Sequence, residues 1–343
     1  MSGDDVLRGR VLDLALGGVV GMDDELFDPV GEQAQRGRGP FVPQAGNMPA
    51  PPVGGPGGWV EDRREQRLGP AANDWPVWTG FVVLLAALVV AAVGGLIVDI
   101  PALVLGVKIT SEHTPPGLEF ADTVVQDVAF VLTAVLFAQF GGRKVRSWQF
   151  GYRSTPVWRA AWLTTLTIVA FLVFSVAWEV VLNVTEKDTK LLEALGTNET
   201  AVLLALSALL TTVIAPICEE TLFRGYIFAA LSKWKGWLPA AVMTGILFGG
   251  VHFGSAPVED LIPLGVLGFA LCLLYRRTGS LYPCIALHSL NNSLAFGELE
   301  GWGWWIPVLM VGSLAAIWVL ALIFRQIGVI SADPPDAIVV PTA

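Results

Sequence analysis

From Trp75 onward, the sequence consists of long apolar runs separated by short polar connections. Eight runs can be distinguished, and they cover residues 77–98, 119–140, 158–182, 200–231, 237–254, 260–276, 281–297 and 304–326. A helix needs about 20 residues to cross a hydrocarbon core of about 30 Å, and most of these runs are close to that length. The pattern predicts an all-α, polytopic transmembrane bundle of about eight spans. Runs five to seven are short or interrupted by polar residues, so they are the least typical transmembrane spans of the predicted bundle.

Three regions follow from this pattern. Residues 1–74 are rich in Gly, Pro and charge, and we expect a disordered cytoplasmic tail because they lack the apolar surface that repays ordering entropy. Residues 75–330 form the predicted membrane domain, and 331–343 a short C-terminal tail. No basic stretch followed by an apolar stretch lies near Met1, so no cleavable signal is predicted.

The basic residues indicate an orientation. If the first span enters from the cytoplasm, the opposite side receives only Lys108, Lys187 and Lys190. The cytoplasmic side then receives Arg63, Arg64, Arg67, Arg143, Lys144, Arg146, Arg153, Arg159, Lys233, Lys235, Arg276, Arg277 and Arg325. This asymmetry agrees with the positive-inside rule. It predicts eight spans with both termini in the cytoplasm.

Composition agrees with a membrane protein. Hydrophobic residues make up 54% of the chain and charged residues 15%, whereas soluble domains carry about 25% charged residues. The net charge is -9 and no basic face accompanies it, so nucleic acid is not expected as a partner. The expected partner is the lipid bilayer. Three cysteines, at 218, 272 and 284, form neither a disulfide framework nor a zinc-finger spacing.

Ionisable residues inside spans are costly and therefore indicate function. In the fourth run, Glu220 and Arg224 are four residues apart, so they share a helix face and can pair. Glu219 points about 100° away from Glu220. Taken alone, the motif is better explained as a buried ion pair with a spare carboxylate near the interface. We interpret Asp127, another acid in a span, as a helix-pairing group rather than a proton relay.

Two further motifs place polar groups on helix faces. Phe248 and His252 are four residues apart at the end of the fifth run, and His288 and Asn292 have the same spacing in the seventh. This spacing places the His288 ring and the Asn292 amide on one helix face, so the two groups can converge on one point. Each motif alone also fits ordinary hydrogen bonding between transmembrane helices.

The fourth and fifth runs are joined by a short turn and should be antiparallel neighbours. Glu219 and His252 are equally distant in sequence from the middle of this turn, between Lys235 and Gly236. With a rise of about 1.5 Å per residue on both helices, they should lie at the same depth. A carboxylate that faces an imidazole is suited to activating a water molecule.

Together these motifs resemble the CPBP family, which includes the CAAX proteases and the bacteriocin-processing (Abi) enzymes. The family patterns Glu-Glu-x-x-x-Arg, Phe-x-x-x-His and His-x-x-x-Asn are matched without departure, in order, within about residues 119–297. The matching residues are Glu219, Glu220, Arg224, Phe248, His252, His288 and Asn292. The resemblance implies that Glu220 and Arg224 orient the reacting groups or the substrate's carboxylate end, and that Phe248 packs behind them.

The resemblance further implies a peptide-bond hydrolase whose site lies within the membrane and opens to the cytoplasm. Glu219 and His252 would activate water, and His288 and Asn292 would stabilise the oxyanion. Whether a cofactor takes part stays open between none and zinc; a zinc ion would use Glu219, His252 and His288. The implied substrate is a membrane-associated peptide or lipidated protein, either prenylated at a CAAX-type terminus or bearing a leader, and a bacterial cell membrane is the expected location.

Two alternatives belong to other functional classes. A non-catalytic immunity or regulatory protein would be expected to have lost at least one acid or histidine of the motifs. A proton-coupled transporter would be expected to have internal repeats or paired broken helices, which the sequence does not show. We therefore favour the endopeptidase.

Overall fold

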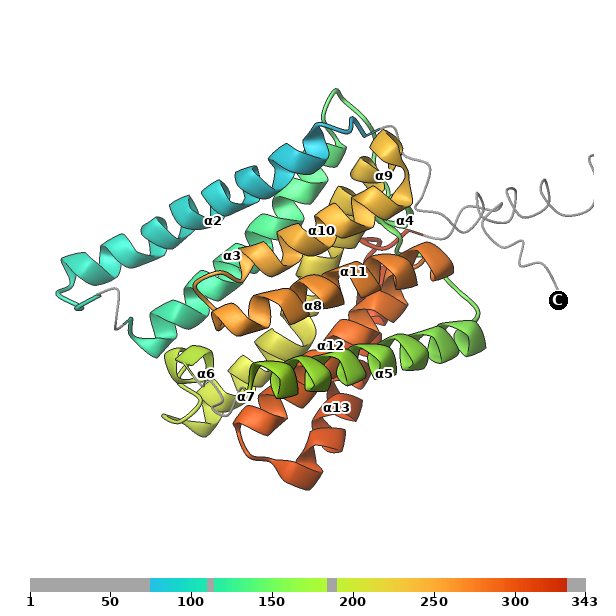
Figure 1. Ribbon diagram of the computed structural model, residues 1–343. Coiled ribbons are helices and arrows are strands. Elements are labelled where there is room, and N and C mark those ends of the chain that lie inside the picture. Colours follow the sequence, from blue (N-terminus) through green and yellow to red (C-terminus); the bar gives the residue numbers. More distant parts are fainter. Residues whose placement is uncertain (1–74, 110–113, 184–189, 332–343) are drawn as a thin grey trace, which may run out of the picture. The chain divides into compact units, whose positions relative to one another are not determined.

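The computed structural model describes residues 75–109, 114–183 and 190–331, which are helical and contain no strand (Figure 1). The longest helix covers residues 201–235 and is called here the central helix. It consists of α7 (Ala201–Leu209), the π-helical segment η1 (Leu210–Ile214), α8 (Ala215–Glu220), the π-helical segment η2 (Thr221–Phe228) and α9 (Ala229–Lys235). The other helices are α2 (Thr79–Val104), α3 (Pro116–Ala138), α4 (Ser147–Phe150), α5 (Val157–Leu182), α6 (Lys190–Ala194), α10 (Trp237–Val251), α11 (Leu261–Thr278), α12 (Leu281–Leu299) and α13 (Ile306–Gln326). Single 3-10 turns, η3 (Val258–Asp260) and η4 (Gly303–Trp305), precede α11 and α13.

Each of the eight apolar runs corresponds to one helix, which confirms the predicted all-α polytopic bundle. Among the described residues, six helices are long and apolar enough to cross a membrane. The other two are α10 and α12. With 15 residues, α10 is only about 22 Å long, shorter than a typical hydrocarbon core. The 19 residues of α12 are interrupted by polar side chains.

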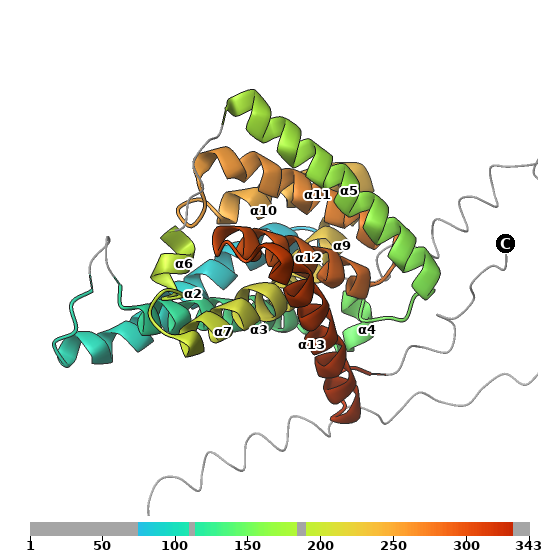
Figure 2. The same ribbon diagram turned by 90° about the horizontal axis from the view of Figure 1, so that it is seen from below.

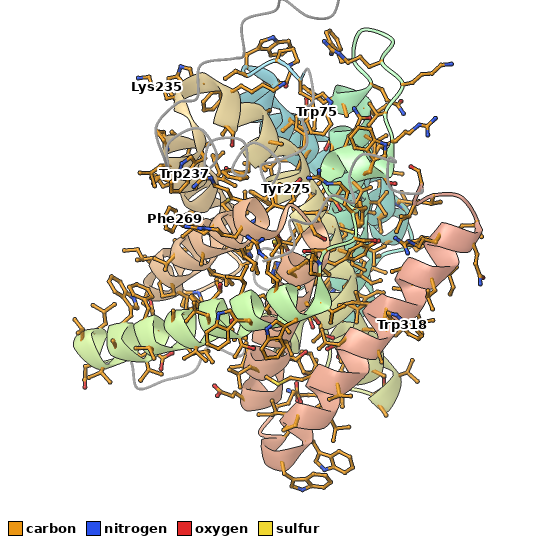
Figure 3. All side chains as sticks on the ribbon, turned by 90° about the vertical axis from the view of Figure 1, so that its right-hand side faces the viewer. Trp75, Lys235, Trp237, Phe269, Tyr275 and Trp318 are labelled. Carbon is orange, nitrogen blue, oxygen red and sulfur yellow. The ribbon has the colours of Figure 1, made fainter. Side chains whose placement is uncertain are left out.

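The outward faces of the helices are apolar. In α5, only Phe171 is buried, and the rest of this helix exposes Trp, Leu and Val side chains. On α13, Trp318 is 65% exposed (Figure 3). Such faces suit lipid, and the chain is therefore a multi-pass integral membrane protein. The sidedness of the termini stays a prediction, and residues 1–74 and 332–343 lie outside the described part.

The central helix is the core around which the others pack. It contacts α2, α3, α10, α11, α12 and α13. Figures 1 and 2 show α2 beside α3 and α10 beside α11, with α5 lying along α11. All side chains of the central helix from Glu220 to Leu231 are buried. The residues of the first polar motif therefore lie at the most enclosed point of the bundle.

Glycines let α10 and α11 pack with their backbones in contact. A Cβ atom on Gly245 would lie 2.7 Å from the carbonyl oxygen of Gly265, and one on Gly249 would lie 2.5 Å from that of Leu261. Small residues permit this close approach between transmembrane helices. The contact holds α11 against the end of α10 that carries Phe248 and His252.

We therefore expect the Gly249→Ala variant to be less stable than the wild type by about 1–3 kcal/mol, because the added methyl group overlaps rigid backbone. Thermal unfolding in detergent measures the change. Gly250→Ala is the matched control, since a Cβ atom there has nothing within 4 Å. Equal stability of the two variants would contradict this account of the α10–α11 contact.

Candidate active site

Two π-helical segments flank the Glu219-Glu220 pair in the central helix. η1 ends at Ile214, α8 spans only Ala215–Glu220, and η2 begins at Thr221. π-helical turns are rare and frequently occur at functional sites, because the extra residue per turn re-aims the side chains around it. All eight residues of η2 are buried, including Arg224. The local backbone thus directs a guanidinium into the interior of the bundle.

Arg224 is held by three kinds of contact. Its Nη1 donates to Glu220 Oε1 over 2.7 Å, and its Nη2 donates to the carbonyl oxygen of Gly268 over 3.0 Å. The guanidinium carbon lies 4.5 Å from the centre of the Phe248 ring, a cation–π distance. The predicted pairing of Glu220 with Arg224 is confirmed. A pair of charges that is fully buried persists only with such additional partners.

Glu220 also fixes the ring of His288. Its Oε1 lies 2.9 Å from His288 Nδ1. A carboxylate paired with arginine accepts hydrogen bonds, so Nδ1 carries the hydrogen and the Nε2 of the neutral ring is unprotonated. That Nε2 lies 3.9 Å from Glu219 Oε2. This distance is too long for a direct hydrogen bond and leaves room for a bridging water molecule.

The two neighbouring glutamates have different surroundings. The side chain of Glu220 is 0% exposed and already paired, whereas that of Glu219 is 12% exposed. Oε2 of both glutamates has no hydrogen-bond partner among the described residues, but Oε1 of Glu220 is bound by Arg224 and His288. Glu220 is therefore held by its neighbours, whereas Glu219 is the less committed and more exposed of the two carboxylates.

His252 lies just beyond the last residue of α10, at its C-cap. Its Nδ1 donates to the carbonyl oxygen of Phe248 over 2.7 Å, so its Nε2 is also unprotonated in the neutral ring. The Phe248 ring packs against both imidazoles, with centroid distances of 5.1 Å to His252 and 5.6 Å to His288. In the part of the chain that is described, Glu219 has an ion-pair contact with His288 and none with His252.

Polar side chains of α12 donate hydrogen bonds to backbone carbonyl groups of η1. Asn292 Nδ2 donates to the carbonyl oxygen of Thr211 over 2.9 Å, and Ser289 Oγ donates to that of Thr212 over 2.6 Å. His288 and Asn292 thus both face the central helix, but they contact it at different turns. One amide hydrogen of Asn292 is used by the π-helical backbone, and the convergence of this amide with the His288 ring on one point stays a prediction.

Asp127 of α3 is a further acid near the site. It is 1% exposed, and its Oδ2 has no hydrogen-bond partner within the described ranges. α3 packs against α8, and the Asp127 carboxyl lies within electrostatic reach of Glu219. The helix-pairing interpretation of Asp127 therefore lacks the expected partner. In the sequence, this residue can be recognised as an acid inside an apolar run, which is costly in a membrane and therefore indicates function.

The candidate metal ligands are not gathered into a metal site. Over the described residues, no three His, Cys, Asp or Glu side chains are close enough together to hold a metal ion. Zinc takes at least three protein ligands in the sites where it catalyses hydrolysis. The donor set of Glu219, His252 and His288 does not meet this condition, and no step below relies on a metal.

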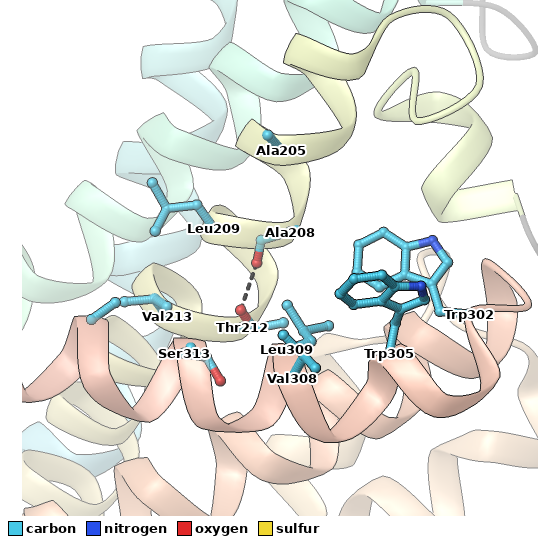
Figure 4. A pocket seen from close by; sticks show the side chains of 12 residues that line it. Ala205, Ala208, Leu209, Thr212, Val213, Trp302, Trp305, Val308, Leu309 and Ser313 are labelled. Carbon is cyan, nitrogen blue, oxygen red and sulfur yellow. Dashed lines mark hydrogen bonds between the residues drawn. The ribbon is translucent and has the colours of Figure 1, made fainter.

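A cavity of about 740 Å³ lies away from these groups, between α7, η1 and α13 (Figure 4). Ala205, Ala208, Trp302 and Trp305 are among its lining residues, and none of the residues of the three motifs lines it. Thr212, which lines it too, donates its hydroxyl to the carbonyl oxygen of Ala208 over 2.6 Å (Figure 4). Its apolar walls make it a lipid-facing groove rather than a reactive site.

Comparison with known proteins agrees with the motifs. Residues 201–294 match the family model "Type II CAAX prenyl endopeptidase Rce1-like". This segment is therefore similar to that family and is called here the Rce1-like domain. This domain contains all seven motif residues, from Glu219 to Asn292, and the match confirms the resemblance predicted from them.

Two bacterial proteins are similar to part of the chain. The chain is 31% identical over 88 residues to the candidate membrane peptidase YdiL of Bacillus subtilis, which is 26% of this chain and 35% of YdiL. It is 31% identical over 80 residues to the UPF0177 protein YxdF of Lactococcus lactis, or 23% of this chain and 42% of YxdF. The matches thus span less than half the length of these relatives. No solved structure matches the chain.

The buried network of the Rce1-like domain predicts a specific stability pattern. Arg224→Met should destabilise the protein by about 3–5 kcal/mol, because it leaves the Glu220 carboxylate buried without its cation. The double variant Glu220→Gln/Arg224→Met should lose less, since it removes both charges. Unfolding in detergent measures the losses of both single variants, Arg224→Met and Glu220→Gln, and of the double variant, with exposed Arg277→Met as the control. A double variant that loses the sum of the two single losses would show that the pair is not coupled.

Proposed function

We propose that this chain is an intramembrane endopeptidase that hydrolyses a peptide bond of a membrane-associated peptide or protein. The observation that carries the proposal is the 3.9 Å distance between Glu219 Oε2 and His288 Nε2 inside the bundle. The Rce1-like domain and the similarity to a candidate membrane peptidase support the same class of activity.

A water molecule between these two atoms would donate one hydrogen to each, because both are acceptors. Its oxygen lone pairs would then be free to attack the carbonyl carbon of the substrate. As the new C–O bond forms, Glu219 takes one proton from the water. When the C–N bond breaks, that proton passes to the nitrogen of the leaving amine.

Glu220 and Arg224 act on this step through His288. Glu220 accepts the Nδ1 hydrogen of His288, which fixes the tautomer and aims Nε2 at Glu219. Arg224 neutralises Glu220 and so keeps it an acceptor. Orientation of a reacting imidazole by a buried carboxylate is the same device that orients histidine in catalytic triads.

His252 and Asn292 have supporting roles in this proposal. The unprotonated Nε2 of His252 is a second acceptor that can relay the proton between Glu219 and the leaving amine. Asn292 has two amide hydrogens, one of which binds Thr211. The other would stabilise the oxyanion, a contribution typically worth about 100- to 1000-fold in rate.

The substrate class follows from the resemblance and from the setting. The reacting groups lie in apolar helices, so a substrate must reach them along the membrane, as a lipidated protein or a leader-bearing peptide does. We propose that the substrate is a prenylated CAAX-type protein or a leader-bearing peptide. A panel of both kinds of peptide distinguishes the two.

The decisive experiment compares Glu219→Gln with wild type in detergent on a farnesylated peptide and a set of leader peptides. We expect cleavage to fall by about 100- to 10,000-fold, because the amide cannot take the proton from water. Glu259→Gln is the matched control, since Glu259 is exposed in η3 and belongs to none of the motifs. Undiminished cleavage by Glu219→Gln would overturn the mechanism, and wild-type protein that cleaves no peptide would favour the regulatory alternative.

A further inference from the structure

A second cavity, of about 440 Å³, lies between α3, the central helix, α13 and the segment that follows α13. Its walls are mainly apolar. They include Val131, Val135, Ile214, Ile217, Leu320 and Phe324. Ligand cavities typically measure about 300–1000 Å³, so this one is large enough for a small molecule or a lipid chain. A water molecule in such a place would find few polar partners, which favours an apolar occupant.

The cavity is separate from the reacting groups. Ile214, Ile217 and Cys218 share one face of the central helix, at spacings of three and four residues, and this face lines the cavity. Glu219 is rotated about 100° away from Cys218. An occupant of the cavity therefore need not touch the carboxylate that we assign to chemistry.

The cavity has the form of a slot along α3. Val131, Val135 and Gln139 line it at intervals of four residues, which is a length of about 12 Å along the helix axis. Gln139 follows the last residue of α3, so one end of the slot lies at the end of the bundle that the charge distribution predicts to be cytoplasmic. An extended hydrocarbon chain fits this shape better than a compact ligand does.

Positive charge marks that end of the slot. Arg146 lines the cavity and is exposed, and no carboxylate in the described part of the chain pairs with its guanidinium. Arg143 and Lys144 precede it, and Arg325 follows the lining residue Phe324. Basic pockets between transmembrane helices on the cytoplasmic side are suited to anionic lipid headgroups.

We propose that this cavity binds an anionic phospholipid, with one acyl chain in the slot and the phosphate group on Arg146. The charge at the mouth selects an anionic headgroup over a zwitterionic one, and the apolar walls bury the chain. This binding site is independent of the proposed peptidase chemistry and can be tested without any substrate.

The bound chain would contact the start of η2. Tyr152 lines the cavity, and its hydroxyl lies 2.6 Å from that of Thr221, the first residue of η2. Thr221 also donates to the carbonyl oxygen of Ile217 over 2.6 Å. The lipid thus adds packing beside the π-helical segment that holds Arg224, and it should stabilise the folded protein by mass action.

The test uses the delipidated full-length protein in detergent, titrated with fluorescent lysophosphatidylglycerol and with the matching lysophosphatidylcholine. We expect tighter binding of the anionic probe and a rise in the unfolding temperature. Arg146→Gln should weaken the binding of the anionic probe by about fivefold and leave the binding of the zwitterionic probe unchanged. Arg277→Gln, an exposed cation on α11 that does not line the cavity, is the control.

A second pair of variants tests the slot itself. Val135→Trp should weaken the binding of both probes by about tenfold or more, because the indole ring would displace several methylene groups of the acyl chain from the slot. Leu136→Trp, on the exposed face of the same helix, should change neither. Equal binding of the two headgroups with no effect of Arg146→Gln would overturn the proposal, even if the Val135→Trp variant failed to fold. Displacement of the probe by a lipidated peptide, but not by excess phosphatidylglycerol, would assign the cavity to substrate and equally overturn it.

Discussion

The structure depends on one buried pair of charges, Glu220 and Arg224. Both side chains are fully inaccessible, and in a membrane domain no water is at hand to solvate them. They therefore need partners from their neighbours: a carbonyl group from α11, an aromatic face from α10 and an imidazole from α12. Buried ion pairs contribute little net stability but can specify one arrangement. Here the requirement ties four helices together at a single point.

The reactive geometry is a consequence of this requirement. Once Glu220 is committed to Arg224 and His288, the neighbouring Glu219 is left with an unpartnered oxygen and some exposure. In the proposed mechanism, the two adjacent carboxylates therefore serve different purposes, one as an anchor and one as a base. The π-helical segments on either side make this division possible, because they alter the direction of the side chains just before and just after the pair.

Much of this could be predicted from the sequence. Apolar run length located the helices because lipid imposes it directly, and the four-residue spacing of Glu220 and Arg224 gave their contact. The imidazole beside Glu219 was predicted less well. The depth argument for His252 assumes a regular α-helix on both sides of the turn, whereas η2 intervenes on one side and α10 ends at Val251 on the other. Neither π-helical segment has a local sequence signal, so the role of His288 required the structure.

The central claim is that Glu220 holds His288 as the tautomer with hydrogen on Nδ1, leaving Nε2 free toward Glu219. Nitrogen-15 NMR of histidine-labelled protein in nanodiscs measures this directly, and with only three histidines in the chain the signals can be assigned by single substitutions. We predict a protonated Nδ1 and an unprotonated Nε2 for His288 at neutral pH, with loss of this preference in Glu220→Ala. A hydrogen found on Nε2, or a tautomer unaffected by that substitution, would contradict the account.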